Sequence, residues 1–391
     1  RSASARRHSL VNFALVTETY PPEVNGVAMT LQRLVRGLAM RGATVTVFRP
    51  RLKGAQAKDS SDPASAAHEL LPSLPLPFYS ELRVGLPVYF RLKKLWRLRR
   101  PDVVHIATEG PLGWAALLAA RKLGIPISTS FHTNFQQYMQ QYMFRAMHGI
   151  ALGYLRAFHN RAACTLTPTD EMRRELEAQR FERVGVLTRG VDGELFSPNR
   201  RREELRQVWG AEPGDPVFLY VGRLAVEKNI ELAVRAFLRA QAVEPRARFV
   251  LVGDGPARGD LQKRYPKFHF AGMRRGADLA AHYASGDVFL FPSATETFGN
   301  VVTEAMASGL AVLCFDYAAG RQHIRSGGNG MLVPLRDGEA FAAAAESMMR
   351  RRDEWPELRR AARATAEAIT WEKVFASFED TLERVRTGRF G

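Results

Sequence analysis

The chain has 391 residues, of which 46% are hydrophobic and 25% charged. At roughly 100 to 200 residues per domain, this length indicates two or three domains and excludes disulfide miniproteins and disordered tails. Charge is the outlier, because 56 Lys and Arg against 40 Asp and Glu give +16. We expect no membrane span, since no apolar run approaches the required length of about 18 residues. The only cysteines, Cys164 and Cys314, lie in apolar segments, which predicts buried, reduced thiols and a cytoplasmic protein.

The positive charge belongs to the first half, where residues 1–195 carry 27 Lys and Arg against 15 Asp and Glu. It peaks in residues 81–100, a stretch of cations interleaved with leucine and aromatic residues that we interpret as a basic amphipathic helix. Such a helix suits an anionic membrane surface, where each cation contributes about 1 kcal/mol. Nucleic acid and a solvated helix packed on the core are the alternatives. The residues assigned to an acceptor or membrane surface are Arg91, Lys93, Lys94, Trp96 and Arg97.

Predicted strands and helices alternate through both halves of the chain. In the first half, the apolar patterns predict strands at 11–16, 43–48, 103–107, 125–131 and 164–167, and helices at 27–40, 112–122 and 138–162. In the second half, they predict strands at 217–221, 248–252, 268–270, 288–291 and 311–315, and helices at 230–241, 257–265, 279–285 and 299–308. This alternation predicts an α/β fold of two doubly wound, Rossmann-like domains that face each other across a cleft.

We therefore expect one domain over residues 1–198 and a second over residues 199–370. A tail over residues 371–391, helical over 371–386, is expected to pack back on the first domain. In such folds ligands bind at the carboxyl ends of the strands.

The most informative segment, residues 291–309, runs from a strand end through a loop into a helix that begins near Gly299. The backbone N–H groups of Phe298, Gly299 and Asn300 are then the unsatisfied donors of a helix N-terminus, which favours a phosphate. Glu296 lies before this helix and Glu304 more than one turn inside it. Two carboxylates beside a phosphate are unfavourable unless hydroxyls of a sugar and a ribose donate to them. The alternative is that one glutamate caps the helix and the other pairs with an arginine.

Three further loops have the same placement after a strand. Arg223 and Lys228 lie five residues apart on one of them and can straddle a diphosphate, although surface ion pairing is the alternative. Gly253 follows another strand and permits close approach of backbone to a nucleotide. Gly26 opens a helix in the first domain, but the surrounding sequence is not G-x-G-x-x-G, which argues against a nicotinamide or flavin dehydrogenase.

His132 ends a predicted strand, where it can donate a hydrogen bond to a sugar hydroxyl or can be a structural histidine. No metal is expected, because the chain has no H-E-x-x-H, no paired cysteines and no Asp-x-Asp. It also has no G-x-S-x-G elbow and no G-x-x-x-x-G-K-[ST] loop, which argues against a hydrolase and against a P-loop protein.

Together these motifs resemble those of the retaining nucleotide-sugar glycosyltransferases of family 4, which have the two-domain GT-B architecture. The most specific mark is the E-x7-E pattern of Glu296 and Glu304. Residues 222–229 are similar to the family's diphosphate-binding stretch, residues 25–27 to its first-domain glycine loop, and residues 189–192 to its interdomain junction. The chain departs from the family in lacking a Glu within residues 321–324 and in carrying Arg189 where Asn is usual.

The resemblance implies an acceptor-binding first domain and a nucleotide-sugar-binding second domain. By it, Arg223 and Lys228 hold the pyrophosphate, Glu296 contacts the donor sugar, and His132 lies at the reacting sugar. The other donor contacts that it implies are Gly26, Gly253, Met273 at the base, the amides of Phe298, Gly299 and Asn300, and Glu304 at the ribose.

Residues 18–22 and 131–138 look most like those of family members that use GDP-mannose. The resemblance thus implies transfer of mannose from GDP-mannose to a hydroxyl of a lipid or glycan acceptor, with retention, without metal and without another cofactor. We expect a cytoplasmic enzyme, peripheral on the inner face of the membrane, that binds no nucleic acid. The alternatives are a UDP-sugar-dependent glycolipid glycosyltransferase, a nucleotide-sugar epimerase and a non-enzymatic binder of anionic surfaces.

Overall fold

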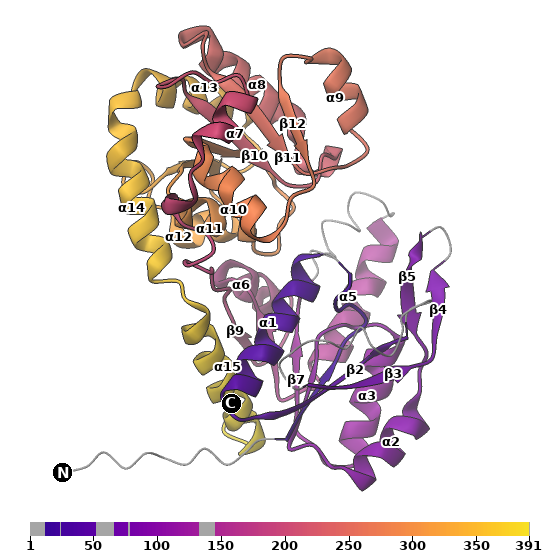
Figure 1. Ribbon diagram of the computed structural model, residues 1–391. Coiled ribbons are helices and arrows are strands. Elements are labelled where there is room, and N and C mark those ends of the chain that lie inside the picture. The colour runs from indigo at the N-terminus through magenta and orange to yellow at the C-terminus, as the bar shows by residue number, and fades with distance from the viewer. Residues whose placement is uncertain (1–11, 24, 52–65, 77–78, 133–144, 391) are drawn as a thin grey trace, which may run out of the picture. The chain divides into compact units, whose positions relative to one another are not determined.

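The computed structural model describes residues 12–23, 25–51, 66–76, 79–132 and 145–390. By its contacts the chain forms two compact units. Unit 1 comprises Arg1–Thr188 and Glu372–Gly391, and unit 2 comprises Arg189–Trp371. Each unit is a parallel sheet with helices packed on it (Figure 1), so the α/β class and the Rossmann-like halves predicted from the alternation are confirmed.

Unit 1 is built on a seven-stranded sheet with the order β3-β2-β1-β6-β7-β8-β9, in which all neighbours are parallel. Its strands are β1 (Asn12–Val16), β2 (Thr44–Pro50), β3 (Ala67–Leu71), β6 (Val103–Ile106), β7 (Ile127–Ser130), β8 (Cys164–Thr167) and β9 (Val184–Val186). The helices are α1 (Gly26–Met40), α2 (Tyr89–Leu98), α3 (Pro111–Lys122), α5 (Arg145–His159), α6 (Asp170–Ala178) and α15 (Trp371–Arg386). The strand order reverses between β1 and β6.

Helix α1 illustrates how local sequence forms these elements. The side chain of Asn25 accepts a hydrogen bond from the N–H of Ala28 and so caps the helix. Its buried stripe, with Leu31, Leu34 and Leu38, repeats at helical spacing and faces the core. The cap is worth about 1 kcal/mol, whereas burial of the stripe supplies most of the stability.

Helix α15 is far from unit 1 in sequence but is part of it. Phe378 packs edge-on against Phe13 of β1, with ring centroids 5.9 Å apart. On the surface, Arg41 and Glu379 form an ion pair at 2.7 Å. The last helix of the chain thus covers the start of the first strand.

Between β3 and α2 the fold differs from the expected basic helix over 81–100. The first part of that stretch belongs to an antiparallel hairpin of β4 (Ser73–Leu76) and β5 (Tyr79–Gly85), and the helix occupies only Tyr89–Leu98. Cations dominate the composition of residues 81–100, and for this reason the short strand at the start of this stretch was not recognised from the sequence. Helix α5 matches the end of the helix expected at 138–162, whose first part lies outside the described residues.

Unit 2 has a six-stranded parallel sheet with the order β12-β11-β10-β13-β14-β15. Its strands are β10 (Val217–Val221), β11 (Arg248–Val252), β12 (His269–Gly272), β13 (Val288–Phe291), β14 (Ala311–Phe315) and β15 (Met331–Val333). The helices are α7 (Glu203–Val208), α8 (Ile230–Val243), α9 (Arg258–Arg264), α10 (Gly276–Ser285), α11 (Asn300–Ala307), α12 (Ala318–His323), α13 (Gly338–Arg350) and α14 (Trp355–Glu367), with 3-10 turns at Pro198–Arg200, Val226–Lys228 and Arg352–Glu354.

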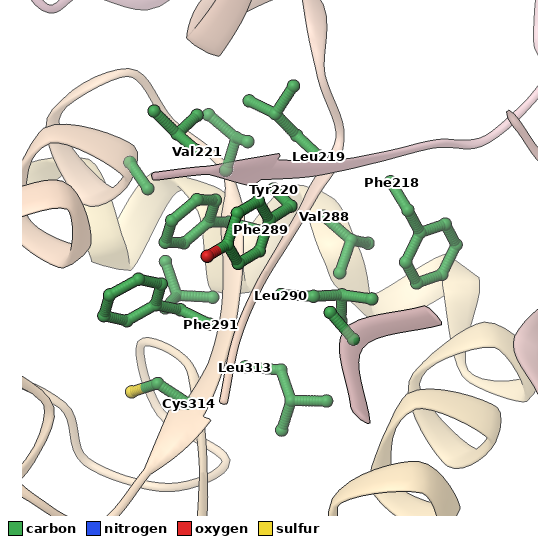
Figure 2. Packing of buried hydrophobic residues seen from close by; sticks show 14 of the residues in the cluster. Phe218, Leu219, Tyr220, Val221, Val288, Phe289, Leu290, Phe291, Leu313 and Cys314 are labelled. Atoms are coloured by element: carbon green, nitrogen blue, oxygen red, sulfur yellow. The ribbon is translucent and has the colours of Figure 1, made fainter. Parts of the chain in front are cut away.

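The core of unit 2 consists of side chains from its central strands. Figure 2 shows Tyr220 of β10, Phe289 and Phe291 of β13, and Leu313 of β14 gathered between the elements. Strands buried on both faces carry continuous apolar runs, which is why β10, β13 and β14 were predictable from the sequence. Cys314 and, in unit 1, Cys164 are buried free thiols as expected, and burial raises the pKa of each to about 12.

A buried ionic network ties the helices of unit 2 to the start of β13. Asp287 is only 7% exposed and contacts three guanidinium groups, those of Arg201 at 3.2 Å, Arg206 at 3.1 Å and Arg359 at 3.2 Å. It also accepts a hydrogen bond from the N–H of Val217 at 2.9 Å. A buried carboxylate with this many partners is satisfied, and removing it takes away the buried counterion of Arg206, which is itself only 2% exposed.

Candidate active site

The site in unit 2 lies where the strand order reverses, between β10 and β13. These strands are neighbours, so the loops that follow their carboxyl ends meet. Lys228, in the loop after β10, places its Nζ 2.6 Å from Oε1 of Glu296, in the loop after β13. The hydroxyl of Ser293 donates to the same oxygen at 2.8 Å. Two residues predicted from separate motifs are thus brought together at the switch point of the sheet.

Helix α11 begins four residues after Glu296. Gly299 is its N-cap, with a φ of 90° that favours glycine, and the helix proper begins at Asn300. Phe298 is 3% exposed, and its carbonyl accepts from the N–H of Ala319 at 2.8 Å, which anchors the loop in the core. The first amides of α11 and the positive end of its dipole therefore lie at a fixed position suited to an anion.

Glu304 is positioned by a buried tyrosine of α10. The hydroxyl of Tyr283 donates to Oε2 of Glu304 at 3.0 Å. Burial and, next, the nearby Glu304 carboxylate raise the pKa of Tyr283 well above its ordinary value, so this hydroxyl keeps its proton and remains a donor. Glu304 lies on the helix that begins beyond Glu296, but the two carboxylates have different partners.

Arg223 is the most exposed of the predicted phosphate ligands. Its side chain is 65% exposed and pairs with Glu227 of the same loop at 3.2 Å, which is the surface pairing weighed as the alternative role. The hydroxyl of the buried Tyr220 donates to the Arg223 carbonyl at 3.1 Å and so supports the loop from within the core. Burial raises the pKa of Tyr220 well above its ordinary range, which keeps it a donor.

Two glycines allow the loops after β10 and β11 to approach each other. A Cβ on Gly253 would lie 2.0 Å from the carbonyl oxygen of Gly222, and φ of Gly253 is 133°. The glycine at this position is therefore required by backbone packing.

Met273, expected at the base, is 56% exposed after the end of β12. Asn300 has a buried Oδ1 with no hydrogen-bond partner among the residues that the structure describes.

Comparison with known proteins shows the family of this chain. The model of Glycosyltransferase Family 4 matches residues 24–195, and that of Glycosyl transferases group 1 matches residues 215–351. A GDP-mannose-dependent alpha-mannosyltransferase of Mycolicibacterium smegmatis is 35% identical over 383 residues, covering 95% of this chain and 98% of that protein. The chain belongs to glycosyltransferase family 4.

Two other proteins extend the comparison. The sulfoquinovosyl transferase SQD2 of Arabidopsis thaliana is 32% identical over 76% of this chain and 60% of its own length. Among solved structures, HepE of Anabaena in complex with UDP superposes with a TM-score of 0.76 at 18% identity, covering 95% of this chain and 99% of that one. The fold of this glycosyltransferase is therefore GT-B.

Unit 1 of the glycosyltransferase carries the remaining predicted residues. His132 is 6% exposed and lies just after β7. The rest of the 131–138 motif, from residue 133, lies outside the described residues. Gly26 is the first residue of α1, beside the capping Asn25, as expected for a turn that opens a helix.

The basic surface of this glycosyltransferase lies on α2. Arg91, Lys94 and Arg97 are exposed, and so are two apolar side chains, Phe90 at 83% and Leu98 at 74%. A hollow at this helix is lined by Phe90, Lys93, Lys94, Arg97 and Leu98. Within the described part of the chain, no helix is both apolar and long enough to pass through a bilayer.

The assignment of Trp96 to that surface was wrong. Trp96 is 1% exposed and packs edge-on against Phe48 of β2, at 5.6 Å between ring centroids. It lies one turn from Leu92, and both side chains face the core. Trp96 follows Leu92 by four residues, so the two side chains share one face of the helix. This spacing in the sequence indicates that Trp96 is buried and does not lie with the exposed cations.

Sequence reasoning missed the residues that hold the two glutamates. Ser293 and Tyr283 each donate to one carboxylate, and Tyr220 supports the Arg223 loop. Ser293 lies three residues before Glu296, a spacing that was visible. Tyr283 had no local signal, because its partner Glu304 lies on a different helix.

Proposed function

We propose that the enzyme transfers mannose from GDP-mannose to a hydroxyl of a lipid or glycan acceptor, with retention at the anomeric carbon and without a metal ion. The observation that carries this proposal is the Lys228–Glu296 pair beside the N-terminus of α11. The choice of donor rests on the likeness to the mannosyltransferase of M. smegmatis over nearly the whole chain. Unit 2 would bind the nucleotide sugar and unit 1 the acceptor.

Departure of the diphosphate is the difficult part of such a reaction. Lys228, Arg223 and the first amides of α11 would stabilise the charge that develops on the leaving phosphate, as preformed dipoles and cations do in other transfers. The released phosphate oxygen would take the proton of the acceptor hydroxyl on the same face of the sugar. The reaction then needs no nucleophilic side chain.

The two glutamates would orient the donor. Glu296, held by Lys228 and Ser293, would accept a hydrogen bond from a hydroxyl of the sugar. Glu304, held by Tyr283, would accept one from the ribose. A site that hydrogen-bonds substrate hydroxyls discriminates strongly against analogues that lack them.

A thermal-shift panel with GDP, UDP, ADP and their hexose conjugates tests the donor, because a ligand that binds the folded state raises Tm. GDP-mannose is expected to give the largest shift in Tm. When an acceptor is added, NMR is expected to show an α-linked product. A largest shift with a UDP-sugar would favour the alternative of a UDP-sugar-dependent glycolipid glycosyltransferase. Free sugar from the donor at the same rate with and without acceptor would contradict transfer.

We further propose that α2 binds an anionic membrane surface. Its exposed cations and the apolar Phe90 and Leu98 beside them combine charge with insertable side chains. Replacing Lys93, Lys94 and Arg97 by Gln should weaken co-sedimentation with phosphatidylglycerol vesicles on the order of 10²-fold, at about 1 kcal/mol per cation. A control with Arg36, Arg121 and Lys122 replaced removes three exposed charges on α1 and α3. Equal sedimentation of the two variants would contradict the proposal.

A further inference from the structure

Arg363 of α14 connects the first segment of unit 2 with the C-terminal end of α11. Its Nη1 lies 2.8 Å from the carbonyl oxygen of Phe196 and 2.6 Å from that of Ala307, the last residue of α11. The carbonyl of Gly193 accepts from Nη1 at 3.2 Å and from Nη2 at 3.1 Å. The side chain is only 23% exposed, and a charged donor makes stronger hydrogen bonds than a neutral one. This guanidinium therefore fixes the backbone around Phe196 against α11.

Phe196 in turn contacts the tyrosine that holds Glu304. Its ring is 4% exposed and packs edge-on against the ring of Tyr283, with the centroids 5.6 Å apart and an angle of 85° between the planes. The hydroxyl of Tyr283 donates to Oε2 of Glu304 at 3.0 Å. Buried rings are closely packed, so a shift of the Phe196 backbone would move the Tyr283 ring and weaken this hydrogen bond. Contacts thus run without interruption from Arg363 through Phe196 and Tyr283 to Glu304.

The rest of the donor site does not depend on Arg363. Arg359, one turn earlier on α14, donates to the carbonyl of Gly309 at 2.6 Å, just beyond the end of α11, and so anchors the same end of that helix. Glu296, before the other end of α11, has its own partners in the loops after β10 and β13. Loss of Arg363 would therefore act on the segment that carries Phe196, and through it on Glu304.

We propose that Arg363 is a positioning residue for recognition of the donor ribose. By holding the carbonyls of Gly193 and Phe196, it keeps Tyr283, and thereby Glu304, in the geometry that accepts a hydrogen bond from a ribose hydroxyl. Hydrogen bonds weaken steeply when their angles change, so a small displacement of the carboxylate is enough to lose this one. The inference rests on the proposed role of Glu304 and names the residues that position it.

Calorimetric titration with a nucleoside diphosphate and with its dideoxy form, which lacks both ribose hydroxyls, tests the proposal. GDP and dideoxy-GDP are one pair of ligands, and UDP and dideoxy-UDP are the other, so the test does not depend on the base. For at least one pair, the wild type should bind the ribose form about tenfold or more tightly, because hydrogen bonds to charged groups are strong. Arg363→Gln should lower that ratio about threefold or more and leave the affinity for the dideoxy form within about twofold.

Arg360→Gln is the matched control, because it removes the same charge from an exposed position on the same helix. It should keep the wild-type ratio. Tyr283→Phe should lower the ratio as Arg363→Gln does. Adding Arg363→Gln to Tyr283→Phe should change the ratio by less than about twofold, because both changes act on one hydrogen bond and residues of one network are not additive.

If Arg363→Gln does not fold, as judged by Tm, Phe196→Leu decides. This variant removes the ring contact with Tyr283 and leaves the backbone carbonyl bonded to Arg363. A lowered ratio in Phe196→Leu supports the proposal, and the wild-type ratio overturns it.

Four other results overturn the inference: an Arg363→Gln variant that keeps the ratio, equal losses for the ribose and dideoxy forms, additive losses in the double variant, and the same loss in Arg360→Gln. A wild type that prefers neither ribose form would overturn both the inference and the ribose role of Glu304. A preference within the UDP pair alone would count against GDP-mannose as the donor, and the variants measured with that pair would then decide the role of Arg363.

Discussion

Lys228 Nζ lies 2.6 Å from Glu296 Oε1, although 68 residues separate them in the chain. Their side chains are only 23% and 18% exposed, so the pair is shielded more than a typical surface ion pair. The contact holds both side chains near the N-terminus of α11 before a donor binds. Such preorganisation reduces the reorganisation that would otherwise slow the chemical step.

Replacing Lys228 by Ala should lower kcat by roughly 10² to 10³, comparable to the loss of one oxyanion-hole donor. The reason is that the developing charge on the diphosphate would lose a cation that we propose stabilises it. Steady-state kinetics with GDP-mannose and acceptor measure the effect, with Lys267→Ala, at an exposed position on the same unit, as the control. Near wild-type turnover of Lys228→Ala would refute the assignment.

Replacing Glu296 by Ala should lower kcat and raise the ratio of donor hydrolysis to transfer, because the sugar would lose the carboxylate that we propose orients it. Ser293→Ala, which removes one hydrogen bond to the same oxygen, should have a smaller effect of about 1 kcal/mol, or roughly fivefold. Product analysis by chromatography separates free sugar from glycoside. An unchanged ratio together with unchanged kcat in Glu296→Ala would count against its role.

Replacing Tyr283 by Phe should weaken donor binding by roughly 3- to 10-fold while preserving the core, because only the hydroxyl that donates to Glu304 is lost. The loss should appear in the KM for GDP-mannose and in the Kd for GDP, with kcat changed much less. A variant with normal GDP affinity would show that the Tyr283–Glu304 contact has no part in nucleotide binding.

Replacing Gly253 by Ala should destabilise unit 2 and abolish donor binding, since the new Cβ would lie 2.0 Å from the carbonyl of Gly222. Gly259→Ala is the matched control, because its added Cβ would meet no atom within 4 Å apart from its chain neighbours and the backbone of its own helix. It sits in α9, where alanine should be neutral or stabilise by about 0.5 to 1 kcal/mol. Thermal denaturation compares the two, and equal Tm values would contradict the packing argument.

Glu18 should make the stability of the protein depend on pH. Burial, its largest influence, raises the pKa of Glu18 to about 7, despite a hydrogen bond from the N–H of Leu112. The folded state therefore binds this proton more tightly than the unfolded state, so the contribution of Glu18 to stability is greatest below about pH 4.5 and falls as the pH rises through about 7. The fall attributable to Glu18 is on the order of 3 kcal/mol.

Glu18→Gln should remove that fall and stabilise the protein at pH 8. Urea denaturation at about pH 5 and about pH 8, on either side of the titration, measures the free energy of unfolding of the variant and the wild type. Glu372→Gln, at an exposed position of unit 1, should leave the pH profile unchanged. Parallel profiles for Glu18→Gln and the wild type would contradict a raised pKa.

Local sequence was enough to predict much of the fold. Continuous apolar runs identified the central strands such as β10 and β13, and helical spacing predicted α15 at its observed bounds, Trp371–Arg386. The helix predicted from residue 299 is α11, which begins at Asn300 after the Gly299 cap. These features depend on residues close together in the chain, so periodicity and capping patterns report them.

Candidate site residues were also visible, because glycines, cations and carboxylates after strand ends are a local pattern. Which of them touch was decided by the tertiary structure. Lys228 meets Glu296 because β10 and β13 are neighbours, and Tyr283 meets Glu304 across two helices. The order of strands in a parallel sheet depends on packing between segments far apart in the chain, and no local periodicity encodes it.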